Sequence, residues 1–320
     1  MTKPQMQANT TEEHSSTHDP CSTSNKCGNP KKESCTQEQK LKQKMNRIKH
    51  KIAVISGKGG VGKSTVAVNL AIAFALHGRK NKVGVLDADI HGPCVPKMLG
   101  LKGKKLVGGP AGMLFPVTGR LGIKVASMDF LLSADDAPVI WRGPLKMRLI
   151  QQFLSDIEWG ELDFLFIDLP PGTGDEPLSV MQLLPEMDGV IIVTMPSEVS
   201  EAVVKKAVTF ARQVGLPIIG IIENMSGFVC PACGAKIDIF RSGGGKRITE
   251  ALSVPYLGSL PIDPEICNFS DSGESFVAEN PTSPSAKAFV EIVSKIEQFI
   301  ENIKTVPACA ENLARKSNRR

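Results

Sequence analysis

The chain reads Gly57-Lys58-Gly59-Gly60-Val61-Gly62-Lys63-Ser64-Thr65 shortly after an apolar run, residues 52–55. An alanine-rich segment with a helical pattern follows. The stretch matches G-x-x-x-x-G-K-[ST], a phosphate-binding pattern that requires a strand before the loop and a helix after it. Glycines let the backbone wrap closely round phosphate oxygens, and the helix N-terminus adds partial positive charge. The stretch therefore predicts a nucleotide site in an α/β fold.

Residue types within the loop indicate separate tasks. Lys63 is expected to reach the β- and γ-phosphates, and the hydroxyl of Ser64 is expected to bind Mg²⁺. Lys58 is a second lysine inside the loop, and on its own it would be interpreted as a solvated side chain. The predicted nucleotide-binding residues of the loop are Gly57, Lys58, Gly59, Gly60, Val61, Gly62, Lys63, Ser64 and Thr65.

Composition is that of an ordinary globular chain, with 42% hydrophobic and 22% charged residues among 320. No apolar run approaches the roughly 18 residues of a membrane span, and the polar N-terminus lacks the apolar core of a secretory signal. The expected location is cytoplasmic, with no membrane partner. The net charge of +5 comes largely from basic segments at residues 40–51 and 314–320. We interpret these segments as solvated and expect no nucleic-acid partner.

Several apolar runs are continuous rather than alternating, such as residues 164–167 and 190–193. Continuous runs indicate strands buried on both faces, which is typical of a mainly parallel sheet. Their alternation with helical patterns predicts a doubly wound α/β fold with helices on both faces. Strands are expected at Lys51–Ser56, Lys82–Asp87, Gly122–Ser127, Phe164–Asp168, Val190–Thr194, Ile218–Asn224 and Tyr256–Leu260. Helices are expected at Lys63–His77, Pro144–Ile157, Pro177–Leu184, Ser200–Val214, Lys246–Ala251 and Pro284–Ile303.

Three regions are expected along the chain. Residues 1–39 have few large apolar side chains and are predicted to form a disordered tail that contains Cys21, Cys27 and Cys35. Residues 40–304 are predicted to form the nucleotide-binding domain, with a basic helical segment starting near Lys40. Residues 305–320 are predicted to form a basic C-terminal tail.

Acidic residues stand where two predicted strands end. Asp87 and Asp89 follow the second strand, and Asp168 ends the apolar run Phe164-Leu165-Phe166-Ile167. A buried strand that ends in aspartate beside a phosphate loop is typical of a Walker B carboxylate, which holds Mg²⁺. The predicted Mg²⁺ ligands are Ser64, Asp87 and Asp168.

Two cysteines, Cys230 and Cys233, are separated by two residues. Such a pair can place both sulfurs on one metal ion or cluster, but alone it is equally compatible with half a zinc site or a redox pair. The chain has no second pair to complete a set of four. A two-fold symmetric dimer would supply the missing pair, and four cysteines could then bind one [4Fe–4S] cluster between the subunits.

The motifs GKGGVGKST, DADIHGP, DLPPGTGD, NMSGFVCPACG and LGSLPIDPEI, taken in this order, resemble the Mrp/Nbp35/ApbC family. This family lies within the deviant Walker A class of P-loop ATPases, together with MinD, ParA and the nitrogenase iron protein. The resemblance runs from about Ile52 to Phe299, and the Cys230–Cys233 motif separates the family from its MinD and ParA relatives. Family members are ATP-dependent iron–sulfur cluster carriers and scaffolds.

The resemblance implies further roles. Lys58 would reach across a dimer to the partner's nucleotide, and Lys58, Lys63 and Asp89 would form the catalytic set, with Asp89 positioning the attacking water. The Gly172 N–H would sense the γ-phosphate, and the Asn224 amide would recognise adenine. The implied ligands are ATP, Mg²⁺ and a [4Fe–4S] cluster, held by a homodimer that delivers the cluster to apo iron–sulfur proteins.

One departure and two alternatives stay open. Relatives of the eukaryotic type carry four N-terminal cysteines, whereas this chain has Cys21, Cys27 and Cys35, one ligand short of such a site. The first alternative is a ParA- or MinD-like positioning ATPase, which predicts a basic face or an amphipathic C-terminal helix. The second is a scaffold that holds zinc and uses ATP only structurally.

Overall fold

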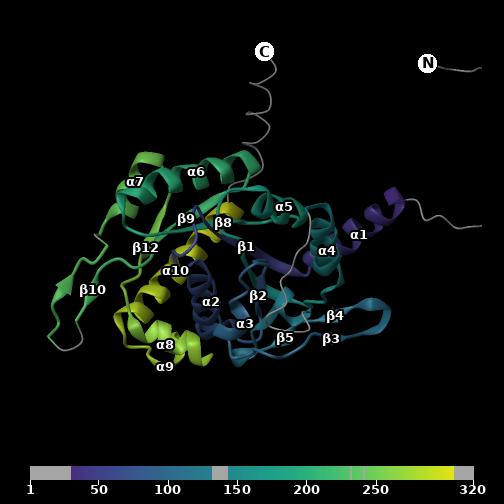
Figure 1. Cartoon of the computed structure of the whole chain (residues 1–320), viewed down its shortest axis with the longest axis horizontal. Coiled ribbons are helices and arrows are strands. Elements are labelled where there is room, and N and C mark those ends of the chain that lie inside the picture. The colour runs from purple at the N-terminus through teal and green to yellow at the C-terminus, as the bar shows by residue number, and fades with distance from the viewer. Residues whose placement is uncertain (1–29, 132–142, 231–232, 241, 306–320) are drawn as a thin grey trace, which may run out of the picture.

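The computed structural model describes residues 30–131, 143–230, 233–240 and 242–305. Its centre is an eight-stranded sheet in the order β12-β9-β8-β1-β7-β2-β6-β5 (Figure 1). Neighbouring strands are parallel, apart from β5, which is antiparallel to β6. The predicted mainly parallel sheet is confirmed. Its strands are β1 (Ile48–Ser56), β2 (Val83–Asp87), β5 (Val117–Thr118), β6 (Lys124–Ser127), β7 (Leu162–Asp168), β8 (Gly189–Thr194), β9 (Ile218–Glu223) and β12 (Tyr256–Ser259).

Helices cover both faces of the sheet, as a doubly wound fold requires (Figure 1). Along β1 the side chains alternate: Ile52 and Val54 pack into one buried cluster with α2 and α10, while Ala53 and Ile55 pack into a second one with α1, α4 and α6. The two clusters form the core. The long helices are α1 (Pro30–Met45), α2 (Lys63–Phe74), α4 (Gly143–Asp156), α5 (Asp175–Leu183), α6 (Glu198–Val214), α7 (Gly244–Leu252) and α10 (Pro284–Thr305).

The chain before β1 contains the basic helical segment expected near Lys40. It is present as α1, which begins at Pro30. Leu41 and Met45 are buried in the core, which anchors the end of this helix against the sheet. Cys35 lies on α1, whereas Cys21 and Cys27 lie outside the described residues, as does the predicted C-terminal tail from residue 306 onward.

Several short elements were not predicted. Helices α3 (Val95–Met98) and α9 (Phe276–Glu279) are single turns, too short to show a helical period. The start of helix α8 (Pro264–Ser272) does have a sequence signal, because Asp263 caps the helix and Pro264 occupies its first turn. Two small hairpins complete the fold: β3 (Val107–Gly108) with β4 (Leu114–Phe115), and β10 (Phe228–Val229) with β11 (Lys236–Ile237).

The parallel arrangement brings the functional segments to one edge. The carboxyl ends of β1, β2 and β7 lie side by side, with Asp87 opposite Asp168 and Asp168 opposite Val54 in the strand register. Ligands of open α/β sheets bind outside this edge. The phosphate-loop motif and both acidic strand ends therefore meet in one place.

Candidate functional site: a nucleotide edge and a cysteine hairpin

The phosphate loop connects β1 to α2 in the arrangement that the motif requires. Gly62 caps α2 with φ +78°, and a side chain there would also collide with Nδ2 of Asn224. That same Nδ2 donates to the carbonyl oxygen of Val61 at 2.9 Å. Asn224, at the end of β9, thus lies directly against the loop.

Lys63 is buried and points to the carboxyl edge. Its Nζ lies 2.5 Å from Oδ1 of Asp168, which ends β7, and 3.4 Å from Oγ of Ser64. The structure therefore brings together three residues that the sequence placed on phosphate and Mg²⁺. Because both charges are out of water, removing either partner would leave the other buried and uncompensated.

Electrostatics at this edge favour a bound cation. Burial raises the pKa of Asp168, although Lys63 and the Ser64 hydroxyl act to lower it. The pKa of Asp87 is raised well above its usual value, because Asp87 is buried and lies near the Asp168 carboxylate. In the described part of the chain, Oδ2 of Asp168 is buried without a hydrogen-bond partner. A free carboxylate oxygen beside a serine hydroxyl fits Mg²⁺, which prefers oxygen ligands.

Both carboxylate oxygens of Asp87, a predicted Mg²⁺ ligand, already accept hydrogen bonds from the chain. Its Oδ1 accepts from the Asp89 N–H at 3.2 Å, and its Oδ2 accepts from the Val95 N–H at 3.3 Å and the Ser127 hydroxyl at 3.2 Å. These bonds hold the loop after β2 against the sheet. Asp87 is thus placed to shape that loop, while Asp168 provides the open acceptor.

The loop after β2 also contacts the start of α5. Asp89 is half-buried, and its Oδ1 accepts from the Gly92 N–H at 3.2 Å. Two residues further along, His91 Nε2 lies 3.2 Å from Oε1 of Glu176. The contact joins the loop that carries Asp89 to the segment that follows Asp168 and Gly172.

The sequence motifs predict ATP hydrolysis at this edge, and on that prediction we expect the His91→Ala protein to hydrolyse ATP severalfold more slowly than the unchanged protein, with its ADP affinity retained. The reason is that the loop carrying Asp89 loses its contact with α5, while the phosphate loop is untouched. Phosphate release gives kcat and KM separately. His77→Ala is the matched control, because His77 pairs with Glu297 at 3.6 Å on α10. Equal kcat values for the two variants would contradict the expected effect.

Two other predicted residues have defined positions. Lys58 is half-buried, and the next two residues of the loop, Gly59 and Gly60, are exposed. The Gly172 N–H donates to the Ser56 carbonyl oxygen at 2.9 Å. Contact between Gly172 and a γ-phosphate would therefore require this hydrogen bond to be exchanged.

A cavity of about 370 Å³ opens beside the loop. Thr65, Asn224 and Met225 line one side, and the segment 261–264 lines the other. An amide among mostly apolar walls fits a purine base. The sequence pointed to Asn224 but assigned no role to Met225 or to residues 261–264. Residues 261–264 belong to the motif LGSLPIDPEI, which served in the sequence only as a mark of family resemblance.

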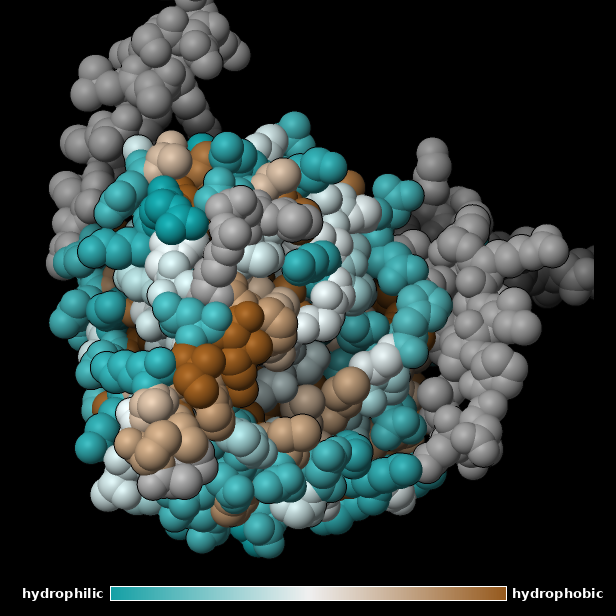
Figure 2. Space-filling model, turned by 60° about the vertical axis from the view of Figure 1, so that its left-hand side comes forward, coloured by the Kyte–Doolittle hydropathy of each residue, from teal (hydrophilic) through white to brown (hydrophobic). Residues whose placement is uncertain are grey.

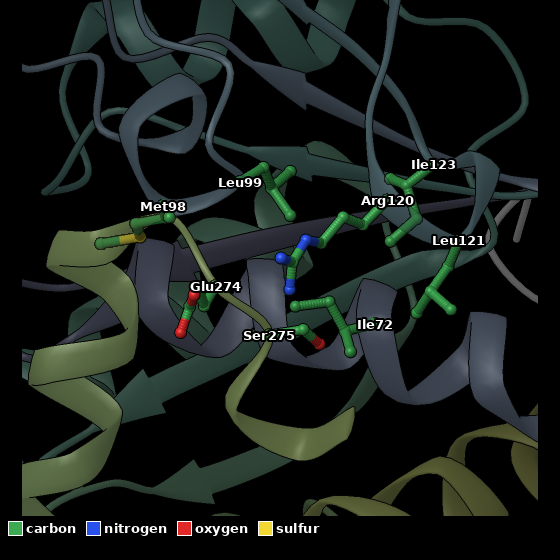
Figure 3. A pocket seen from close by; sticks show the side chains of 9 residues that line it. Ile72, Met98, Leu99, Arg120, Leu121, Ile123, Glu274 and Ser275 are labelled. Atoms are coloured by element: carbon green, nitrogen blue, oxygen red, sulfur yellow. The ribbon is translucent and has the colours of Figure 1, made fainter. Parts of the chain in front are cut away.

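A second, much smaller pocket does not fit a nucleotide. It lies between α2, α3 and the loop after α8, where Ile72, Leu99 and Arg120 point toward one another (Figure 3). Its volume is about 10 Å³, room for a single water molecule. This small pocket is therefore excluded as a nucleotide site.

Cys230 and Cys233 lie in the turn of the β10–β11 hairpin, which extends from the body of the molecule (Figure 1). Neither is in a disulfide, and Cys233 is exposed. Figure 2 shows a patch of apolar surface on this side of the molecule, and the side chains of Val229, Ile237, Ile239 and Phe240, in the hairpin and just after it, are each at least 40% exposed. Within the described ranges, no group of three or more His, Cys, Asp or Glu side chains is arranged to hold a metal ion.

A parallel sheet, a phosphate loop closed by Gly62 and the buried Lys63–Asp168 pair define a P-loop NTPase. A family model described as ParA, NUBPL iron-transfer P-loop NTPase, matches residues 47–297. The chain belongs to this family.

Relatives agree with this membership. An iron–sulfur cluster carrier protein of Saccharolobus solfataricus is 53% identical over 263 residues, covering 82% of this chain and 88% of its own length. A nucleotide-binding protein of Archaeoglobus fulgidus, solved in complex with ADP, has a TM-score of 0.67 and 40% identity, covering 78% of this chain and 95% of its own. The cell division ATPase MinD of Pyrococcus furiosus has a TM-score of 0.57 at 25% identity, covering 78% and 98%.

Proposed function

We propose that the protein is an ATP-hydrolysing carrier of iron–sulfur clusters. In this proposal two copies hold one [4Fe–4S] cluster between them and deliver it to apo-proteins. The sequence similarity to a protein named as an iron–sulfur cluster carrier supports the cargo. Similarity to a protein solved with ADP supports the nucleotide.

The observation that carries the proposal is the position of the cysteine pair. Cys230 and Cys233 are thiols on an extended hairpin, and the hairpin follows directly after Asn224 at the nucleotide edge. Thiolates are the usual ligands of such clusters. Two cysteines per chain complete a set of four when a two-fold axis passes near the hairpin. The apolar surface round the hairpin suits contact with a second copy.

Nucleotide chemistry in this proposal depends on positioning. The loop N–H groups and Lys63 bind the phosphates, and Asn224 with the cavity walls holds the base. Ser64 and Asp168 would hold Mg²⁺, which supplies charge neutralisation of the phosphates when it is bound. Asp89 orients the attacking water, and Lys58 of each subunit reaches the nucleotide of the other.

No helix in the described part of the chain is long and apolar enough to cross a membrane.

The positioning-ATPase alternative predicts an amphipathic C-terminal helix whose apolar face is free to lie on a membrane. Helix α10 is amphipathic, but its apolar side chains Phe289, Ile292, Val293 and Ile296 are buried in the core. That face is therefore not available to a lipid surface.

Anaerobic reconstitution with iron and sulfide, followed by metal analysis, tests the cargo. We expect about four iron atoms per dimer, visible charge-transfer absorbance and a dimer by size exclusion. Transfer to an apo-acceptor is then measured with and without ATP, and the rates are expected to differ because the nucleotide and the hairpin adjoin the same strand. Zinc without iron would support the scaffold alternative and contradict the proposal. Equal rates of cluster transfer with and without ATP would contradict the proposed role of ATP in transfer.

A further inference from the structure

Glu223 is a charged residue buried completely at the end of β9. Its carboxylate accepts three hydrogen bonds, from the Ser226 hydroxyl, the Gly243 N–H at 3.0 Å and the Gly245 N–H. Three donors on one buried carboxylate compensate for its lost hydration. None of the roles assigned above to the nucleotide or to the cluster uses this residue.

The three donors come from two separate stretches of the chain. Ser226 precedes β10, where the cysteine hairpin leaves the body, while Gly243 and Gly245 follow the hairpin, where the chain enters α7. One carboxylate therefore fastens both ends of the segment that carries Cys230 and Cys233. In the following, the two ends are called the feet of the hairpin, residues 226–229 and 242–245.

The glycines of the second foot are explained by this contact. Gly243 caps α7 with φ +76°, and a Cβ at Gly245 would lie 2.8 Å from Oε2 of Glu223. A glycine-rich turn leading into a helix presents N–H groups that bind anions. Here the anion is the Glu223 carboxylate of the same chain, which holds the turn in place.

The strand that carries Glu223 also reaches the nucleotide edge. Asn224 is the next residue, its side chain donates to the Val61 carbonyl oxygen, and its own N–H donates to the Thr194 carbonyl oxygen at 2.7 Å. Met225 has φ +57°, an unusual backbone conformation for a side chain of its size, and lines the base cavity. A contiguous set of contacts thus leads from the phosphate loop through Asn224 to Glu223 and the hairpin feet.

We propose that Glu223 is a positioning residue that couples nucleotide binding to the order of the cysteine hairpin. The inference rests on the proposed function for its biological meaning, since the hairpin is proposed to hold the cluster. A nucleotide that fixes Asn224 against the loop also fixes Glu223, and Glu223 then holds both feet. By linkage, a cluster that orders the hairpin strengthens nucleotide binding by the same factor.

Hydrogen exchange of the feet tests the coupling without any cluster. In the unchanged protein, ADP is expected to slow exchange at residues 226–229 and 242–245. In Glu223→Gln, the amide offers one acceptor oxygen where the carboxylate offered two. Exchange at both feet is expected to rise about tenfold, since a charge-assisted hydrogen bond is lost, and the protection by ADP is expected to disappear.

Glu250→Gln is the matched control, because it makes the same chemical change at an exposed position of α7. It should exchange like the unchanged protein. Ser226→Ala removes a single donor and serves if Glu223→Gln does not fold. That variant should loosen residues 226–229 while residues 242–245 keep their protection by ADP.

Three outcomes would overturn the inference: no effect of ADP on the feet of the unchanged protein, equal exchange in the two glutamine variants, or undiminished ADP protection in Glu223→Gln. A further measurement separates this inference from the proposed function. If the reconstituted protein holds no iron, the cluster proposal fails, and the exchange data still decide whether Glu223 couples the nucleotide to the hairpin. If iron is bound, cluster loading should strengthen ADP binding in Glu250→Gln and leave it unchanged in Glu223→Gln.

Discussion

Cys230→Ala and Cys233→Ala proteins are each expected to lose the proposed bridging cluster completely after anaerobic reconstitution. Each substitution removes one thiolate from both subunits of a symmetric dimer, so two ligands remain where a [4Fe–4S] cluster takes four. Iron content and charge-transfer absorbance measure the loss. Nucleotide binding should persist, because the hairpin turn lies outside the cavity and the phosphate loop.

Cys267→Ala is the control for a general loss of thiols. Cys267 is also exposed and reduced, but it lies on α8 rather than on the hairpin. This variant should retain its full iron content. An intact cluster in either hairpin variant would contradict the bridging arrangement, and loss of iron in Cys267→Ala as well would show that reconstitution responds to thiol number alone.

The fold was predictable because its signals are local. Continuous apolar runs such as residues 190–193 indicate strands covered on both faces, and the seven strands expected from the sequence are all present. Helix α1 is a case where the local signal is weak. Its segment is polar, and Leu41 and Met45 near its end are buried in a core that other segments build.

The site was predictable only in part. Motif spacing placed Lys63 beside Asp168, because each stands at a fixed point relative to a strand end. The base cavity combines residues near 65, 225, 262 and 289, and no local pattern shows that these segments meet. Glu223 was missed for a similar reason: a glutamate after an apolar run looks solvated until the distant turn at residues 243–245 folds over it.

The Lys58→Ala protein is expected to bind ATP and ADP normally and to hydrolyse ATP about 10³-fold more slowly, the scale of a cation supplied in trans to phosphoryl transfer. Lys58 is half-buried, whereas Lys63 is buried in its contact with Asp168. The loss of Lys58 should therefore leave the phosphate-binding part of the loop intact. Lys63→Ala is the contrast, since it removes the buried ammonium itself and should abolish nucleotide binding.

Mixing two inactive variants tests whether Lys58 acts on the partner's nucleotide. A mixed dimer of Lys58→Ala and Asp89→Ala subunits has one complete site, in which the first subunit supplies Asp89 and the second supplies Lys58. Equal mixing makes half of the dimers mixed, each with one working site of two, so activity should recover to roughly a quarter of the unchanged protein. If Lys58 instead acted within its own subunit, both sites of every mixed dimer would lack one residue, and mixing would restore nothing although the subunits still exchange.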